Sequence, residues 1–122
     1  MTVTFDSSAW IEYFAGSKQG KIVKKYIERL DTIYTPSIAI MEIKSKYQRE
    51  GKPWQTRIDY ICERSIVVKI DTEIALLAAD LKKKYGLYSI DALIYAVSLN
   101  ADTTLLTRDH HFDGLKNTII LN

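Results

Sequence analysis

Short apolar runs alternate along this chain with longer segments in which apolar residues recur every three or four positions. Short apolar runs bounded by turn residues predict buried strands, and the longer spacing predicts amphipathic helices. We expect strands at residues 2–5, 32–35, 65–70, 104–107 and 118–121. We expect helices at residues 7–14, around 22–30, from 37 to about 49, from 53 past 61, from 72 to about 85 and from 89 to about 99.

This alternation predicts an α/β fold. Strands separated by helices, with no hairpin signal between them, favour parallel pairing and a sheet covered on both faces. Such sheets bind ligands at the carboxyl ends of their strands. The 122 residues fit one domain with a single core, without a repeat or a linker, so we expect one domain over residues 1–122.

Acidic residues stand in or beside apolar segments at four places. Asp6 ends the first predicted strand, and Asp109 follows the strand at 104–107. Glu42 lies a full turn inside its helix, and Asp91 lies in the first turn of another. Charged side chains are rarely buried without partners, so four carboxylates at one sheet edge indicate a bound cation. An all-oxygen site suits Mg²⁺ or Mn²⁺, which would support metal-assisted phosphodiester hydrolysis.

Each acid also has an ordinary structural explanation. Asp6 and Asp109 could cap the segments that follow them. The negative charge of Asp91 could interact favourably with the positive end of its helix dipole. Glu42 has no capping role, so its alternative is a half-exposed surface position. Asp71 is fully explained as the N-cap of the helix behind it, and we leave it outside the site.

The histidines and the cysteine add little to the expected chemistry. Adjacent residues such as His110 and His111 do not share a helix face, so we expect them in a surface turn. A structural zinc site is not expected without a cysteine cluster or a spaced histidine pair. The single cysteine, Cys62, follows Ile58 and Ile61 on an apolar helical stripe, and we expect it in the core.

Composition places the chain among globular proteins of the cytoplasm. Hydrophobic residues make up 47% and charged residues 26%, and the first residues do not resemble a signal peptide. No apolar run approaches the roughly 18 residues that span a bilayer. The net charge of +2 is too small to indicate nucleic-acid binding by itself. We expect the lysine clusters to be solvated helix faces, and the cluster after Glu42 is the one nearest the predicted site.

Taken together, the four acids and their contexts resemble the PIN-domain family, and within it the VapC-type toxin ribonucleases of toxin–antitoxin pairs. The matching segments, in order, are FDSSAWI at 5–11, PSIAIMEI at 36–43, YSIDALIYA at 88–96 and LLTRDHHF at 105–112. Residues 52–84 match only in their pattern of helix and strand.

This resemblance implies a three-layer α/β/α sandwich around a parallel sheet, and a Mg²⁺- or Mn²⁺-dependent ribonuclease. It places Asp6, Glu42, Asp91 and Asp109 as the acids that hold the metal. Ser8 and Thr107 match hydroxyl positions that support these acids. Asp113 lies near a position where a further acid occurs in the family, in an uncertain register.

The resemblance also implies partners: an RNA substrate, a second copy of the chain in a homodimer, and a small antitoxin protein. We expect the antitoxin to bind along residues 7–14 and the following turn. Two alternatives stay open, a PIN-like module that binds RNA or protein without cutting, and a housekeeping nuclease without an antitoxin. A phosphoacceptor domain is disfavoured because Asp6 is followed by Ser7 and Ser8 rather than by a second acid.

Overall fold

A central parallel sheet of five strands organises the protein. The computed structural model describes residues 1–122, and its strands lie in the order β3-β2-β1-β4-β5, all pairs parallel. The strands are β1 (Thr2–Phe5), β2 (Thr32–Pro36), β3 (Ile66–Val68), β4 (Thr104–Thr107) and β5 (Thr118–Ile120). The helices are α1 (Ser7–Ala15), α2 (Lys18–Glu28), α3 (Ser37–Arg49), α4 (Gln55–Arg64), α5 (Thr72–Tyr85) and α6 (Ser89–Asn100), with a short 3₁₀ helix η1 (His110–Phe112).

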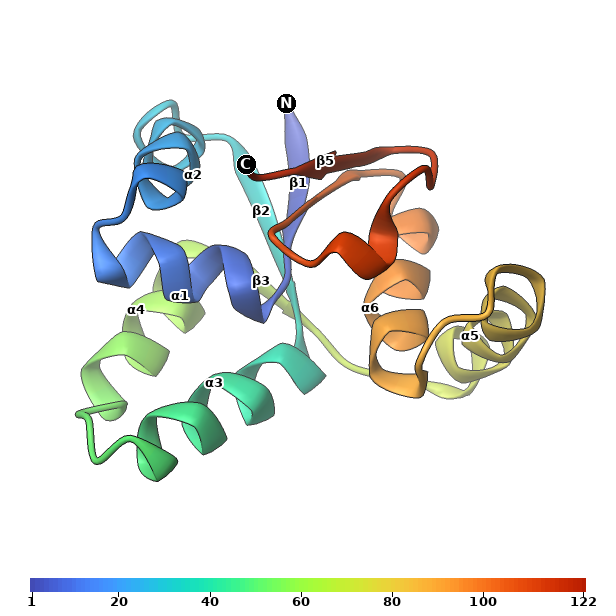
Figure 1. The fold of residues 1–122 in the computed structure, drawn as a ribbon, viewed down its shortest axis with the longest axis horizontal. Helices are drawn as coiled ribbons and strands as arrows, with labels where there is room; N and C mark the ends of the chain where they lie inside the picture. The colour runs from blue at the N-terminus through green and yellow to red at the C-terminus, as the bar shows by residue number, and fades with distance from the viewer.

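Helices cover both faces of the sheet, which confirms the predicted α/β/α sandwich. Figure 1 shows α1 to α4 on one side of the strands and α5 and α6 on the other. Successive side chains of a strand point to opposite faces, so Leu106 joins the core under α1 and α2, whereas Leu105 joins the core under α5 and α6. This two-sided burial is why the strands are short runs of apolar residues and threonine without charged residues.

The sheet has a topological switch point between β1 and β4. From the central β1 the chain moves to β2 on one side and reaches β4 on the other. In open α/β sheets a crevice forms at the carboxyl ends of two such strands, and ligands bind there. Helix α1 leaves β1 at this edge and α3 leaves β2 at the same edge, where α3 contacts both α1 and α6.

The helix α1 is fixed against α2 by a close backbone approach. Gly16 ends α1 in the left-handed region, with φ 65°, where glycine meets no steric penalty. Ser17 then caps α2 by accepting the N–H of Gly20. A Cβ at Gly20 would lie 2.0 Å from the carbonyl oxygen of Glu12, so only glycine allows this contact. The start of α1, at the carboxyl edge of the sheet, is held in place as a result.

Most of the predicted boundaries agree with the structure within one or two residues, and the differences have local causes. Strand β3 is shorter than predicted because it is an edge strand that pairs only with β2. Cys62 is exposed, so its predicted core position was wrong. Helix α4 buries Ile61, and a residue one position later points about 100° away around the helix. None of the helices combines the length and apolarity needed to cross a membrane.

The aromatic residues divide between the core and its margin. Trp10 and Tyr47 are buried, whereas Tyr13, Phe14 and Trp54 are half-buried and pack against the same core. Trp10 donates its indole N–H to the hydroxyl of Thr35 at 3.0 Å, which satisfies its one polar group. The half-buried rings leave aromatic surface beside α1.

Candidate functional site

The site lies at the switch point, where Asp6 follows β1 and Asp109 follows β4. The register pairs Phe5 with Leu106, so the two strands end side by side. The backbone N–H of Asp6 donates to the carbonyl of Leu106 at 3.4 Å and continues the ladder past the end of β1. Strand pairing therefore brings together two carboxylates that are about a hundred residues apart in the sequence.

Asp6 is a buried carboxylate held by three donors. Only 3% of the residue is exposed. Its Oδ1 accepts hydrogen bonds from the Ser8 hydroxyl at 2.7 Å and from the Ala9 N–H at 3.0 Å, and the second bond makes Asp6 the N-cap of α1. Its Oδ2 accepts from the Thr107 hydroxyl. Capping and a place in the site, which we treated as alternatives, coexist in this residue.

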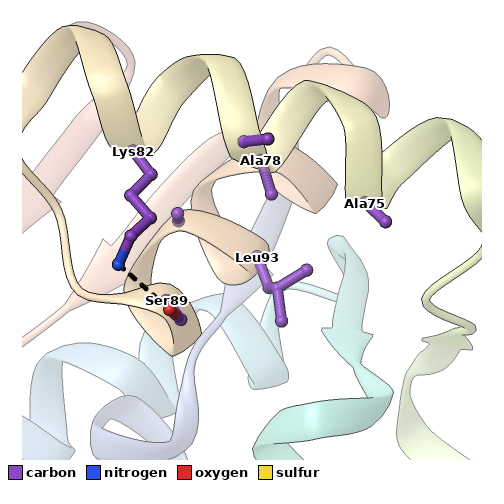
Figure 2. Close-up of a pocket in the computed structure, with 7 residues that line it drawn as sticks. Ala75, Ala78, Lys82, Ser89 and Leu93 are labelled. Carbon is purple, nitrogen blue, oxygen red and sulfur yellow. Dashed lines mark hydrogen bonds between the residues drawn. The ribbon is translucent and has the colours of Figure 1, made fainter.

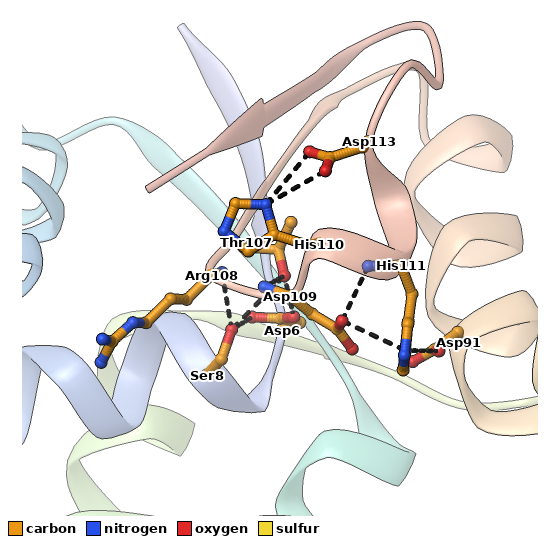
Figure 3. Close-up of polar contacts among 9 residues, drawn as sticks. All are labelled: Asp6, Ser8, Asp91, Thr107, Arg108, Asp109, His110, His111 and Asp113. Carbon is orange, nitrogen blue, oxygen red and sulfur yellow. Dashed lines mark hydrogen bonds and ion pairs between the residues drawn. The ribbon is translucent and has the colours of Figure 1, made fainter. Parts of the chain in front are cut away.

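The turn after β4 is tied to the start of α1 by the same hydroxyl groups (Figure 3). The Thr107 hydroxyl accepts from the Asp109 N–H at 2.9 Å, and the Ser8 hydroxyl accepts from the Arg108 N–H at 2.8 Å. The Arg108 side chain forms an ion pair with Glu12 of α1. Ser8 and Thr107 thus orient both Asp6 and the backbone that carries Asp109.

Asp91, Asp109 and His111 form the tightest group of potential metal ligands. Each offers one ligand atom, and these atoms all lie within 4.8 Å of one another. The His111 Nδ1 lies 3.0 Å from Asp91 Oδ2 and 3.1 Å from Asp109 Oδ1 (Figure 3). Asp109 also accepts the backbone N–H of His111 at 2.9 Å and so caps η1. Asp91 projects toward this group from the first turn of α6.

Glu42, on α3, is the fourth predicted acid and lies outside the group formed by Asp91, Asp109 and His111. It is half-buried and accepts a hydrogen bond from the Ser7 hydroxyl at 3.1 Å. Its pKa is raised mainly by burial, with a smaller lowering by Ser7 and a further rise from the charges of Asp6, Asp91 and Asp109. The other three carboxylates are therefore close enough to disfavour a negative charge on Glu42.

The pKa values of Asp6 and Asp91 are raised as well. Burial raises the pKa of Asp6 from 3.8 to about 6, although the hydrogen bonds from Thr107, Ser8 and Ala9 oppose the rise. Burial also raises the pKa of Asp91, the charge of Asp109 adds to that rise, and His111 counteracts it. A bound cation would remove this penalty by favouring the charged carboxylates.

The structure thus brings all four predicted acids to one edge, with Ser8 and Thr107 beside Asp6. Asp113 lies outside this group, since its carboxylate pairs with His110 Nδ1 at 3.1 Å and both side chains are exposed. Both histidines lie in an exposed turn, as predicted. Our sequence reasoning missed that His111 reaches two of the acids. The available signal was its position two residues after Asp109 and directly before the apolar Phe112.

Comparisons with known proteins agree with this fold. The sequence model of the PIN domain matches residues 3–117, so the chain belongs to the PIN-domain family. A search of curated proteins found no match.

Solved structures share the same architecture at low sequence identity. A toxin–antitoxin complex from Klebsiella pneumoniae matches with a TM-score of 0.82 and 21% identity, covering 98% of each chain. VapBC2 from Rickettsia felis, solved with a fragment of promoter DNA, matches with a TM-score of 0.73 and 17% identity, covering 98% of this chain and 97% of the other. VapC20 from Mycobacterium tuberculosis, described as a toxin that cleaves the sarcin–ricin loop, matches with a TM-score of 0.66 and 14% identity. The match covers 93% of this chain and 91% of VapC20.

The raised pKa of Asp6 predicts how stability depends on pH without metal. A carboxyl whose pKa is higher in the folded state stabilises the fold below its unfolded pKa, and this contribution is lost as pH rises through the folded value. The interval from 3.8 to about 6 corresponds to about 3 kcal/mol. Asn can still cap α1, so Asp6→Asn should gain stability relative to wild type by up to that amount as the pH rises from 3.8 to about 6, with no further gain above.

Denaturant unfolding in EDTA at several pH values measures this difference. Asp71→Asn is the matched control, because Asp71 is an exposed N-cap of α5 away from the site. Because the Asp71 side chain is exposed, Asp71→Asn should not gain stability over wild type. A difference between Asp6→Asn and wild type that stayed constant with pH would show that Asp6 carries no burial penalty.

Proposed function

We propose that this protein is a metal-dependent endoribonuclease, and that it is the toxin of a toxin–antitoxin pair. The observation that carries the proposal is the meeting of Asp6, Glu42, Asp91 and Asp109 at the switch point of a PIN-family sheet. We further propose that residues 1–122 act as one nuclease domain in the cytoplasm. Single-stranded or looped RNA is the substrate we propose, because its backbone can be splayed into an open edge of this kind.

The donor set fits a hard divalent cation. Four carboxylates offer the oxygen ligands that Mg²⁺ and Mn²⁺ take in proteins, and Asp6, Glu42, Asp91 and Asp109 would hold the ion. When bound, Mg²⁺ or Mn²⁺ would lower the pKa of a water molecule and neutralise charge on the scissile phosphate.

Neighbouring side chains fix the orientation of the carboxylates that would hold the ion and the attacking water. Ser8 and Thr107 hold the carboxylate of Asp6 in one orientation, with Oδ1 and Oδ2 both engaged. Glu42 uses Oε1 to accept from Ser7, which leaves Oε2 to accept a hydrogen bond from the attacking water.

Replacing Asp91 by Asn tests catalysis and metal binding together. Cleavage of RNA in Mg²⁺ or Mn²⁺ should fall by more than the roughly 10–100-fold typical of residues that only support a metal ligand. Carboxylates about 5 Å apart repel by roughly 3 kcal/mol at an effective dielectric near 20, so the variant should melt higher than wild type in EDTA. Added Mn²⁺ should raise the Tm of wild type and have a smaller effect on the variant.

The control for this experiment is again Asp71→Asn, which should retain cleavage and the response to Mn²⁺. An Asp91→Asn protein that cut RNA at the wild-type rate would remove Asp91 from the site. Wild-type protein that failed to cut RNA in either ion would instead favour a PIN-like module that binds without cleaving.

An antitoxin would bind, in this proposal, in a hollow between α1, α3 and α4. The hollow holds about 180 Å³. Ile11, Phe14 and Tyr47 line its apolar part, and the guanidinium of Arg57 lies 4.4 Å from the centre of the Tyr47 ring. Such a surface suits an amphipathic helix. An arginine of the partner reaching Asp6 or Asp109 would pair with a metal-site carboxylate and inhibit the nuclease. One of the structural relatives, from Klebsiella pneumoniae, is described as a toxin–antitoxin complex, which supports this proposal.

Filling the hollow should prevent inhibition without stopping cleavage. Ala15 is exposed and lines the hollow at the end of α1, so Ala15→Trp should block a partner helix sterically. Co-expression with the protein encoded beside this gene should suppress wild-type nuclease activity and leave that of Ala15→Trp largely intact. Lys18→Trp, at an exposed position on α2, should be suppressed like wild type. A neighbour that neither binds nor inhibits wild type would favour the housekeeping nuclease.

A second copy of the chain would bind, in this proposal, against α5 and α6. A groove of about 230 Å³ lies between these helices. Small side chains that include Ala75 and Ala78 line it, and Lys82 of α5 donates to Ser89 of α6 (Figure 2). Leu76 on the same helix is 66% exposed. Small residues allow two helices to approach closely, and the apolar surface would be buried in a dimer.

Light scattering after size exclusion tests the dimer. Wild type should be dimeric at micromolar concentration, and Leu76→Glu should be monomeric, because burial of an unpaired charge opposes association. Leu30→Glu is the control, since Leu30 is 82% exposed in the turn before β2, away from the groove. A monomeric wild type would overturn the proposed dimer.

A further inference from the structure

His111 has an imidazole nitrogen placed against two carboxylates of the candidate metal site. Its Nδ1 lies 3.0 Å from Asp91 Oδ2 and 3.1 Å from Asp109 Oδ1 (Figure 3). These acids come from different elements, the first turn of α6 and the turn between β4 and η1, so the histidine bridges them across the edge of the sheet.

The two distances are those expected of neighbouring ligands around one ion. A six-coordinate ion with ligands at about 2.1 Å has adjacent ligand atoms about 3.0 Å apart. The nitrogen is this far from each oxygen. The three ligand atoms also lie within 4.8 Å of one another, close enough for one ion to reach them all with small adjustments of the side chains.

The position of His111 is fixed by its neighbours. Phe112 next to it is fully buried and anchors the turn in the core under α5 and α6. The backbone N–H of His111 donates to Asp109, which sets the turn relative to β4. On its other side the Tyr88 ring lies 5.0 Å from the imidazole, centre to centre. The adjacent His110 instead turns away to Asp113.

We propose that His111 is a nitrogen ligand of the metal ion, so that the centre is a mixed nitrogen–oxygen site rather than an all-carboxylate one. This inference rests on the proposed metal-dependent function and adds a ligand to it. Coordination through Nδ1 leaves Nε2 to carry the ring proton. Imidazole suits transition metals, whereas Mg²⁺ prefers oxygen, so His111 shifts the preference of the site from Mg²⁺ toward Mn²⁺.

Electron spin-echo spectroscopy of Mn²⁺ bound to the intact protein tests this proposal without any assay of activity. Wild type should show the ¹⁴N coupling of a directly coordinated imidazole. His111→Ala and His111→Gln should both lose this coupling. Gln has a side chain of comparable length, but it would offer the metal a carbonyl oxygen in place of a nitrogen. The control His110→Ala should retain the coupling, because His110 faces Asp113.

Ion binding measured by calorimetry gives the second readout. His111→Ala should weaken Mn²⁺ binding by about tenfold or more, the lower end of the loss seen when even a supporting residue is removed. The same change should weaken Mg²⁺ binding less, so the ratio of the two dissociation constants should shift toward Mg²⁺.

The outcomes separate this inference from the function beneath it. Tight Mn²⁺ binding without a nitrogen coupling, or an equal loss of Mn²⁺ and Mg²⁺ affinity in His111→Ala, would overturn the nitrogen ligand and leave the nuclease intact. Failure of wild type to bind Mn²⁺ would also overturn the nitrogen ligand, and failure to bind either Mn²⁺ or Mg²⁺ would overturn the proposed metal-dependent function as well.

Discussion

The buried carboxylate of Asp6 is the group on which the rest of the site depends. It receives hydrogen bonds from Ser8 and Ala9 at the start of α1 and from Thr107 at the end of β4. One charged group thereby joins the central strand, the first helix and the neighbouring strand at the sheet edge. Burial without these donors would be too costly for a carboxylate, and even with them its pKa is raised to about 6.

The same edge concentrates negative charge that the fold does not neutralise. Burial raises the pKa values of Glu42 and Asp91. The charges of the other three acids add to the rise for Glu42, the charge of Asp109 adds to it for Asp91, and His111 compensates for Asp91 only in part. Perturbed pKa values of this kind gather at functional sites, because the arrangement is retained for its chemistry rather than for stability. In the function we propose, a divalent cation supplies the missing positive charge.

The helical layers leave separate surfaces for other partners. Helices α1, α3 and α4, which border the hollow, lie on one side of the sheet, and α5 and α6, which border the alanine-lined groove, lie on the other (Figure 1). An antitoxin and a second copy of the chain could therefore bind at the same time in the proposed assembly. Because α1 also begins at Asp6, a ligand seated along α1 would lie close to the carboxylates.

The fold followed from the sequence because its signals are local. Apolar runs such as the one that ends at Phe5, capping residues such as Asp71, and Gly86 as the end of α5 each act within a few residues. Cys62 was misplaced because the face of a short helix depends on a rotation of about 100° per residue, which the stripe of apolar residues defined too loosely.

The sequence by itself determined the order of the elements and the parallel sheet and predicted the four acids, and its resemblance to the PIN-domain family added Ser8 and Thr107 as supporting residues. Only the tertiary structure decided which atoms meet. Pairing of β1 with β4 ties Asp6 to Thr107, and the packing of the turn after β4 on Phe112 carries His111 to Asp91. Such contacts join residues far apart in the chain, and no local pattern encodes the distance between them.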